Sequence, residues 1–247
     1  MNTDNTAVSG ETIDYGPCAF MDIYHPEKVF SSIDQMGRYA FGNQPSIMQW
    51  NLAQLAQCLL PLFATDTDAA LSLAQAEIDA YPRQFELALC AVMRAKLGLQ
   101  TEQDGDLALG LDLLECMAEG KADFTNTFRH LANAIDVDGT DSTDVRGMFD
   151  DAAAFDAWTE RWQARLRDEK SEPAACAAAM RRANPAVIPR NHLVEAAIRA
   201  AEDNGDFQPF NDLVDEVVQP FDPRPAHSLY VQQPAPHEVV SKTFCGT

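Results

Sequence analysis

Three oxygen-bearing side chains near the start of the chain could hold a divalent cation and a nucleotide. Asp4 and Asn5 are adjacent, and Asp14 follows after a short stretch that contains Gly10. Carboxylate and amide oxygens are hard ligands that suit Mg²⁺, so Asn5 and Asp14 are candidate metal ligands. Asp4, beside them, could accept a proton as a general base, which is chemistry that phosphoryl or nucleotidyl transfer requires. A solvated hairpin without chemistry is the alternative that residues 1–16 leave open.

A loop and a short hairpin are expected to position these side chains. β-branched residues and Gly10, between two polar clusters, predict a small N-terminal β-hairpin that carries Thr12 to Tyr15 and brings Asp4 towards Asp14. Residues 17–45 are rich in Pro, Gly, Asp and aromatic residues and have no helical period, which predicts an irregular but ordered segment. Irregular segments of that length in compact domains often carry function.

The rest of the chain is predicted to be mainly α-helical. Four leucines recur at the spacing of one face of an amphipathic helix, which Pro61 kinks or ends: Leu52, Leu55, Leu59 and Leu62. Thr67 is expected to cap a second helix, and Pro82 to open a third. The predicted helices after the first cover 67–80, 82–98, 107–117, 124–135, 148–167, 172–183, 191–202 and 206–218.

This pattern divides the chain into three parts: a site segment over 1–45, a helical body over 46–219 and a tail over 220–247. The tail contains several prolines that interrupt helices, so it is predicted to be an extended strap on the surface.

Composition narrows the class of protein. The chain has 18 Lys and Arg against 38 Asp and Glu, a formal net charge of -20, which disfavours nonspecific binding to nucleic acid or to an anionic membrane. No run of about 18 apolar residues is present, so no membrane-spanning helix is expected. The N-terminus also lacks the pattern of a secretory signal, and a cytoplasmic protein of bacterial type is expected.

The six cysteines include no Cys-x-x-Cys pair, so neither a zinc site nor a dense disulfide framework is indicated. Four lie in apolar, helix-like contexts and are interpreted as small core residues of a reduced protein: Cys58, Cys90, Cys116 and Cys176. Cys245 differs because it lies close to the C-terminus.

Other patterns indicate structure more than chemistry. The acidic stretch from Asp136 to Asp144 is interpreted as a solvated loop, because its glycine is misplaced for a calcium-binding loop. Trp158 and Trp162 lie one helical turn apart and are expected in the core. No Gly-x-Ser-x-Gly motif supports a serine hydrolase.

Asp14-Tyr15-Gly16 resembles the Asp-Phe-Gly metal-binding motif of protein kinases. Further blocks of sequence in order along the chain carry a wider resemblance: Asn2–Asn5, Thr12–Pro17, Gly37–Pro45, Trp50–Leu52, Leu55–Leu62, Phe124–Arg129 and Asn184–Asn191, with Ala196–Ile198 and Asp206–Phe207 after them. Together these blocks resemble the selenoprotein O (SelO, or YdiU) family of kinase-like protein adenylyltransferases.

The resemblance implies transfer of AMP from ATP, with Mg²⁺ or Mn²⁺, to Ser, Thr or Tyr hydroxyls of protein substrates. It implies that Asp4 is the catalytic base, that Asn5 and Asp14 are metal ligands and that Asp14 also lies against the nucleotide. It implies the fold of a kinase-like C-terminal lobe. No nucleic-acid or membrane partner is implied.

The resemblance also implies that family members carry an N-terminal lobe, with a lysine and arginines for the phosphates, before the Asp-Asn motif. This sequence resembles the C-terminal lobe only, so the isolated chain is expected to transfer AMP poorly or not at all. A noncatalytic helical interaction module, or a remnant of an enzyme, is the alternative.

Two further roles are implied by the same resemblance. Cys245 resembles a redox-active selenocysteine or cysteine near the end of family members, although Phe30 stands where an internal partner would align. An exposed bystander thiol is the alternative for Cys245. Arg38 and Tyr39 lie where a kinase-like fold places its substrate-facing segment, and anchoring of that segment is the alternative role.

Overall fold

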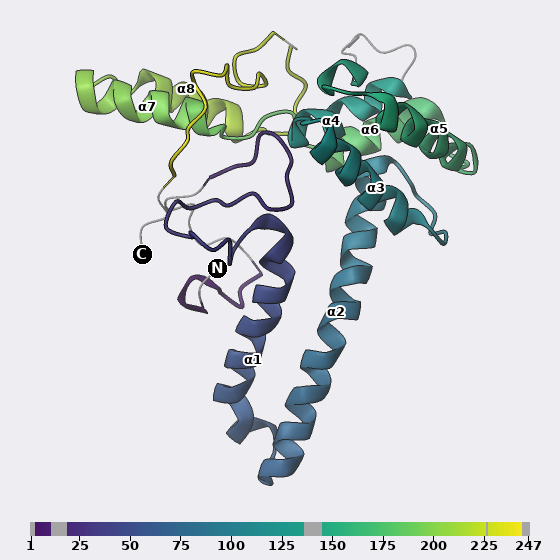
Figure 1. Ribbon diagram of the computed structural model, residues 1–247, viewed down its shortest axis with the longest axis vertical. Helices are drawn as coiled ribbons and strands as arrows, with labels where there is room; N and C mark the ends of the chain where they lie inside the picture. Colours follow the sequence, from purple (N-terminus) through teal and green to yellow (C-terminus); the bar gives the residue numbers. More distant parts are fainter. Residues whose placement is uncertain (1–2, 11–18, 136–144, 226, 244–247) are drawn as a thin grey trace. The chain divides into compact units, whose positions relative to one another are not determined.

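The computed structural model describes residues 3–10, 19–135, 145–225 and 227–243, and over these residues the protein is mainly α-helical, as predicted (Figure 1). Within them the only β pairing is an isolated bridge between Ile23 and Asp123. The α-helices are α1 (Gln44–Phe63), α2 (Thr67–Leu97), α3 (Asp106–Glu119), α4 (Phe124–Leu131), α5 (Ala153–Arg167), α6 (Pro173–Ala183), α7 (Asn191–Asn204) and α8 (Gln208–Val217). Short 3-10 helices are Thr3–Asn5, Phe41–Asn43, Ala132–Ala134 and Arg146–Met148. No helix in these ranges is both long and apolar enough to cross a bilayer.

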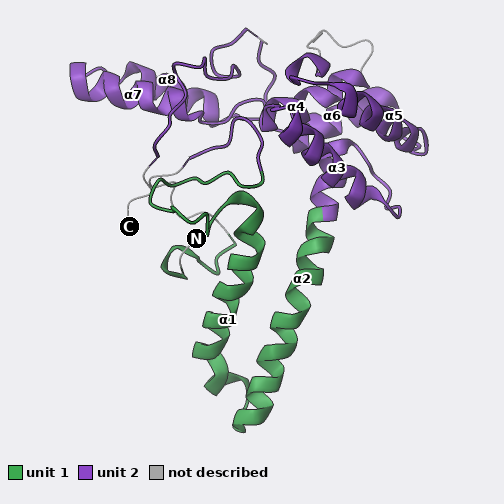
Figure 2. Cartoon of the chain, in the orientation of Figure 1, with its two compact units in different colours: residues 1–18, 26–89, 244–247 green, residues 19–25, 90–243 purple. Residues whose placement is uncertain are grey.

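The chain forms two compact units (Figure 2). The first unit comprises residues 1–18, 26–89 and 244–247, and the second comprises 19–25 and 90–243. Helix α2 therefore contributes its longer N-terminal part to the first unit and its last turns to the second. The predicted hairpin over Thr12–Tyr15 lies outside the described residues and stays a prediction.

In the first unit, α1 and α2 each contain an internal proline. Pro61 lies within the last turn of α1, in agreement with its expected place near the helix end. The prediction that Pro82 opens a new helix is wrong, because α2 runs unbroken past it. Proline at position 82 cannot donate to the carbonyl of Ile78 one turn earlier. Gln49 Nε2 on α1 donates to that carbonyl instead, at 3.0 Å, so a side chain replaces the missing backbone donor.

A pair of stacked tryptophans forms the centre of the second unit, as predicted. The rings of Trp158 and Trp162 on α5 are 5.4 Å apart between centroids, and both side chains are fully buried. Each indole N–H finds a backbone acceptor: Trp158 donates to Leu109 O at 2.8 Å and Trp162 to Leu97 O at 2.9 Å. These bonds satisfy the polar atoms of large apolar side chains and fix α5 against α3 and the end of α2.

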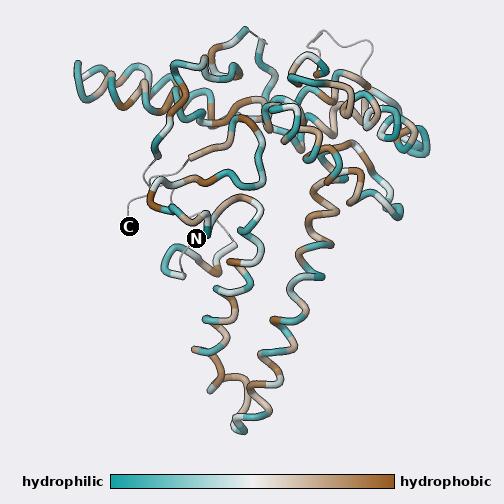
Figure 3. Tube along the Cα trace, in the orientation of Figure 1, coloured by the Kyte–Doolittle hydropathy of each residue, from teal (hydrophilic) through white to brown (hydrophobic). Residues whose placement is uncertain are grey.

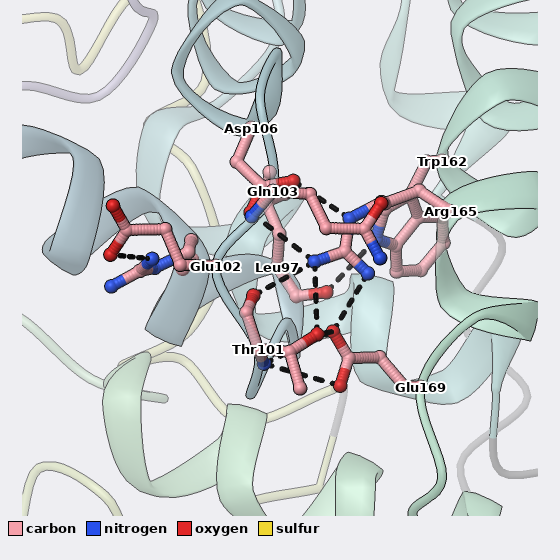
Figure 4. Close-up of polar contacts among 9 residues, drawn as sticks. Leu97, Thr101, Glu102, Gln103, Asp106, Trp162, Arg165 and Glu169 are labelled. Carbon is pink, nitrogen blue, oxygen red and sulfur yellow. Dashed lines mark hydrogen bonds and ion pairs between the residues drawn. The ribbon is translucent and has the colours of Figure 1, made fainter.

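A largely buried arginine at the end of α5, with a side chain 10% exposed, holds the loop before α3 (Figure 4). Arg165 Nε lies 2.7 Å from Asp106 Oδ1, and Arg165 Nη1 lies 2.8 Å from Glu169 Oε1. Arg165 Nη2 also donates to the carbonyl of Thr101 at 2.8 Å. Because the guanidinium is shared by two carboxylates and a carbonyl, its desolvation is largely compensated, and it joins the end of α5 to residues 101–106, which are distant in sequence.

The junction between α2 and the rest of the second unit requires glycine. Gly98 has φ of +78°, and a Cβ there would lie 2.7 Å from Cys176 Sγ and 2.9 Å from Met180 Sδ. Just before it, Lys96 Nζ lies 4.6 Å from the ring centroid of Phe128 and donates to Asn184 Oδ1 at 3.0 Å. Burial lowers the pKa of Lys96 to about 8, while the ring face favours the charged form.

The boundaries of the remaining helices match the predictions closely, with two exceptions. The helix predicted over 124–135 is α-helical only to Leu131, and Ala132–Ala134 continue as a 3-10 helix. The predicted helix over 148–167 begins only at Ala153, because Arg146–Met148 form a separate 3-10 turn and Phe149 is extended. Residues 218–225 and 227–243 form turns and bends without helix or strand. Val231 of this tail is buried with Ala186 and Val187 in a small apolar cluster.

Candidate active site

Asp4 and Asn5 lie together on the 3-10 helix Thr3–Asn5, where both side chains are exposed. The turn continues to Thr6, whose backbone N–H donates to Thr3 O at 3.4 Å. A carboxylate and an amide on consecutive residues, both open to solvent, are accessible to a ligand. Asp14, Tyr15 and Gly16 lie outside the described residues, and so does Cys245.

A buried asparagine on α1 anchors this loop. Asn51 is only 5% exposed, and its Nδ2 donates to Thr6 Oγ1 at 3.0 Å. The bond joins positions 45 residues apart, so it ties the loop that carries Asp4 and Asn5 to a long helix in the same unit. A buried amide in a helix that contains no charged residue is costly unless it is hydrogen-bonded, and the contact with Thr6 meets part of that need.

The segment over residues 34–50 is held in place by a carboxylate that accepts backbone N–H groups and by a guanidinium that lies over two aromatic rings. Both carboxylate oxygens of Asp34 accept backbone N–H groups, from Arg38 and from Tyr39, each at 2.8 Å. The Arg38 guanidinium lies over two rings, 5.7 Å from the centroid of Tyr39 and 5.1 Å from that of Trp50 on α1. These contacts supply the anchoring role that the sequence left open for Arg38.

In the second unit, residues 19–25, which follow the Asp-Tyr-Gly motif in sequence, pair with the start of α7. Phe20 N donates to Asn191 Oδ1 at 2.9 Å, and Asn191 Nδ2 donates to Phe20 O at 2.7 Å. An amide side chain thus makes both backbone bonds that a neighbouring strand would make. Tyr24 N adds a bond to Ala122 O at 3.0 Å.

Arg190 forms a buried charged cluster beside this pairing. Its guanidinium is paired with Asp22 and lies 2.8 Å from Asp123 Oδ2, and it donates to Val231 O at 3.1 Å. Asp123 also caps α4 by accepting from Asn126 N at 2.7 Å. Burial raises the pKa of Asp123, and the positive charge of Arg190 opposes that rise. Removing either partner would leave an uncompensated buried charge.

The described residues supply part of the predicted metal site. Asn5 and the neighbouring carboxylate of Asp4 are hard oxygen donors that suit Mg²⁺ or Mn²⁺ and are open to solvent. Within the described ranges, no group of three His, Cys, Asp or Glu side chains is arranged to hold a metal ion. The predicted ligands are the amide of Asn5 and the carboxylate of Asp14, so the donor chemistry of Asn5 fits while Asp14 lies outside these ranges.

Sequence reasoning missed the residues that position the loop. Asn51 entered only as part of a resembling block, and no signal in the sequence separates it from the four glutamines of the same helix, none of which is buried. Asp34 gave no periodic signal, because a carboxylate that caps a turn is defined only by the fold.

The four cysteines expected in the core are all on helices and all free, but only one is buried. Cys176 is buried, whereas Cys90 and Cys116 are partly exposed and Cys58 is exposed. The core interpretation is therefore wrong for Cys58, whose side chain is exposed although α1 contains no charged residue. Burial raises the pKa of the Cys176 thiol, which makes it a poor nucleophile.

Comparison with known proteins identifies the family. The profile described as "Protein adenylyltransferase SelO" matches residues 1–218. Proteins called "Protein nucleotidyltransferase YdiU" from a Bradyrhizobium sp. strain and from Rhodopseudomonas palustris are 54% and 53% identical to this chain over 247 residues. In each case the match covers 100% of this chain and 50% of the relative, so the chain spans about half the length of these curated relatives. The chain belongs to the SelO family of protein nucleotidyltransferases.

Proposed function

We propose that this chain carries the catalytic base and the metal ligands of a protein adenylyltransferase, within the C-terminal lobe of a kinase-like fold. The observation that carries the proposal is the exposed Asp4–Asn5 pair on a loop that the buried Asn51 ties to α1. A catalytic loop needs exposed functional groups on a backbone that the rest of the fold anchors, because small displacements of reacting groups lower the rate by large factors.

In the proposed reaction a Ser, Thr or Tyr hydroxyl of a protein substrate attacks the α-phosphorus of ATP. A new oxygen–phosphorus bond forms to the hydroxyl, the bond from the α-phosphorus to the bridging oxygen breaks, and pyrophosphate leaves. Asp4 accepts the hydroxyl proton. Asn5 and Asp14 would hold the cation, Mg²⁺ or Mn²⁺, which supplies neutralising charge to the phosphates when bound. Asp14 would also lie against the nucleotide.

The chain spans about half the length of its relatives, so we expect the isolated polypeptide to have only part of their activity. The residues proposed here supply cation ligands and a base, and the matched region covers only 50% of each relative. We therefore expect weak, cation-dependent ATP binding by the chain alone, and AMP transfer only once the rest of a family member is present.

Two experiments test the proposal, one on ATP binding and one on AMP transfer. Calorimetry on the full chain should detect ATP binding that requires Mg²⁺ and is lost in Asp14→Ala. A chimera, in which this chain replaces the matching half of the Bradyrhizobium relative, should transfer label from [α-³²P]ATP to protein and none from [γ-³²P]ATP. Asp4→Asn should abolish transfer without abolishing ATP binding, because it removes the base and leaves the ligands.

Asp68→Asn is the matched control, since Asp68 is an exposed acid in the first turn of α2. It should change neither binding nor transfer. Transfer from the γ-labelled nucleotide would show phosphoryl transfer instead. Absence of ATP binding and of transfer in the chimera would leave the noncatalytic interaction module as the function.

A further inference from the structure

Helix α1 has the composition of a buried helix, yet its apolar side chains are not buried. None of its 20 residues is charged, and Asn51 is its only buried residue. A helix that is apolar around its circumference is normally enclosed by other elements. Hydrophobic and hydrophilic positions alternate along α1 (Figure 3), and its polar residues are amides and one serine.

One side of α1 carries a stripe of leucines with no buried member. We call Leu52, Leu55, Leu59 and Leu62 the leucine stripe; their spacing places them on one face of the helix. Leu55 is 38% exposed and Leu62 is 79% exposed, while Leu52 and Leu59 are partly exposed. The spacing is that of a helix face that packs on a core, yet none of the four side chains is buried, although Asn51, one turn before Leu55, is covered at Thr6.

The first unit as a whole has almost no interior. Among its described residues only Ala40, Asn51 and Ala70 are buried, while Leu71 and Leu73 on α2 are 48% and 55% exposed. So little apolar burial cannot offset the conformational entropy of ordering two long helices. The unit therefore requires apolar surface from another source.

We propose that the leucine stripe of α1 is the docking surface for the half of a SelO-family polypeptide that this chain does not match. The curated relatives contain about as much polypeptide again outside the matched region. An uncharged helix calls for an apolar partner surface, which the interior of the same family fold provides. A second copy or an anionic membrane fits less well, because each copy carries a net charge of -20 and repels both.

Co-purification tests this surface. The full chain is coexpressed with the tagged, unmatched half of the Bradyrhizobium relative, so that neither piece has to fold alone. We expect a complex of one copy of each. Carbene footprinting should label the leucine stripe in the isolated chain. In the complex, the labelling yield of the stripe should fall to that of Leu113, which is fully buried in the second unit.

The double variant Leu55→Asp/Leu62→Asp should weaken the complex by at least roughly tenfold, because burying one leucine accounts for about that factor. Both positions are exposed in the chain alone, so the helical circular dichroism should not change. Val218→Asp is the matched control: Val218 is 63% exposed in the second unit, and its substitution should leave the complex intact.

Four results would overturn the proposal. The first is a complex that the double variant forms as tightly as the unmodified chain. The second is failure of the coexpressed halves to associate. The third is a leucine stripe already protected in the isolated, monomeric chain, which would mean that the chain covers it itself. The fourth is a dimer of the chain alone that the double variant dissociates, which would assign the surface to a second copy. None of these results depends on nucleotide transfer.

Discussion

In the first unit, a hydrogen bond from the Gln49 side chain replaces the backbone bond that Pro82 cannot make, and this replacement can be tested quantitatively. Pro82 cannot donate to Ile78 O, and Gln49 Nε2 does so at 3.0 Å. Gln49→Ala should therefore leave a partly buried carbonyl without this donor and destabilise α2 by about 1–2 kcal/mol. In Pro82→Ala, residue 82 regains its N–H and can bond to Ile78 itself, so Gln49→Ala should then cost close to nothing.

The double-mutant cycle isolates this effect from helix propensity. Pro82→Ala alone should stabilise the helix by up to about 3 kcal/mol, because proline is the least favourable residue in a helix interior. The coupling energy between the two substitutions should be about 1 kcal/mol. Native-state hydrogen exchange at the amides of residues 67–89 measures it, since local opening of α2 need not follow global unfolding. Additive effects within error would refute the replacement of the missing donor by Gln49.

Three further predictions concern the anchored loop, a buried lysine and a glycine. Asn51→Ala should weaken Mg²⁺-dependent ATP binding several-fold, because it releases the loop that bears the candidate base; unchanged affinity in calorimetry would argue against anchoring. The pKa of Lys96 is lowered to about 8 from 10.5 by burial, so the folded state binds fewer protons than the unfolded state between these values. Stability relative to Lys96→Met should thus rise between pH 8 and 10.5 by up to about 3 kcal/mol in urea titrations, and a flat difference would contradict it. Gly98→Ala should cost about 2–4 kcal/mol, because its Cβ would meet Cys176 Sγ at 2.7 Å, whereas Gly105→Ala, also at positive φ but with open space around it, should cost only about 1 kcal/mol.

Local signals were sufficient to predict most helices. The helix at Phe124 begins after an aspartate whose side chain caps it, and α6 begins at Pro173, where proline is favoured. The failure at Pro82 has a tertiary cause, because a glutamine 29 residues away in sequence supplies the donor that lets the helix continue. No window of sequence around Pro82 contains that information.

The candidate site likewise has features that the sequence predicts and features that only the fold defines. The exposure of Asp4 and Asn5 on a turn agrees with their polar residue types, while their roles as base and metal ligand stay predictions. The role of Asn51 was not, because a hydrogen bond to Thr6 is defined only when α1 and the loop meet. The exposure of Cys58 and of the leucine stripe was not predictable either: spacing indicates which face of a helix is apolar, and only the fold shows whether anything covers it.

The Arg190 cluster also constrains the order in which the second unit can be completed during synthesis. Its partners lie 168 residues earlier at Asp22, 67 residues earlier at Asp123 and 41 residues later at Val231. Contacts of such separation form late, because long loops must close first. Residues 19–25 must therefore wait, without their partners Arg190 and Asn191, until both of those residues have left the ribosome.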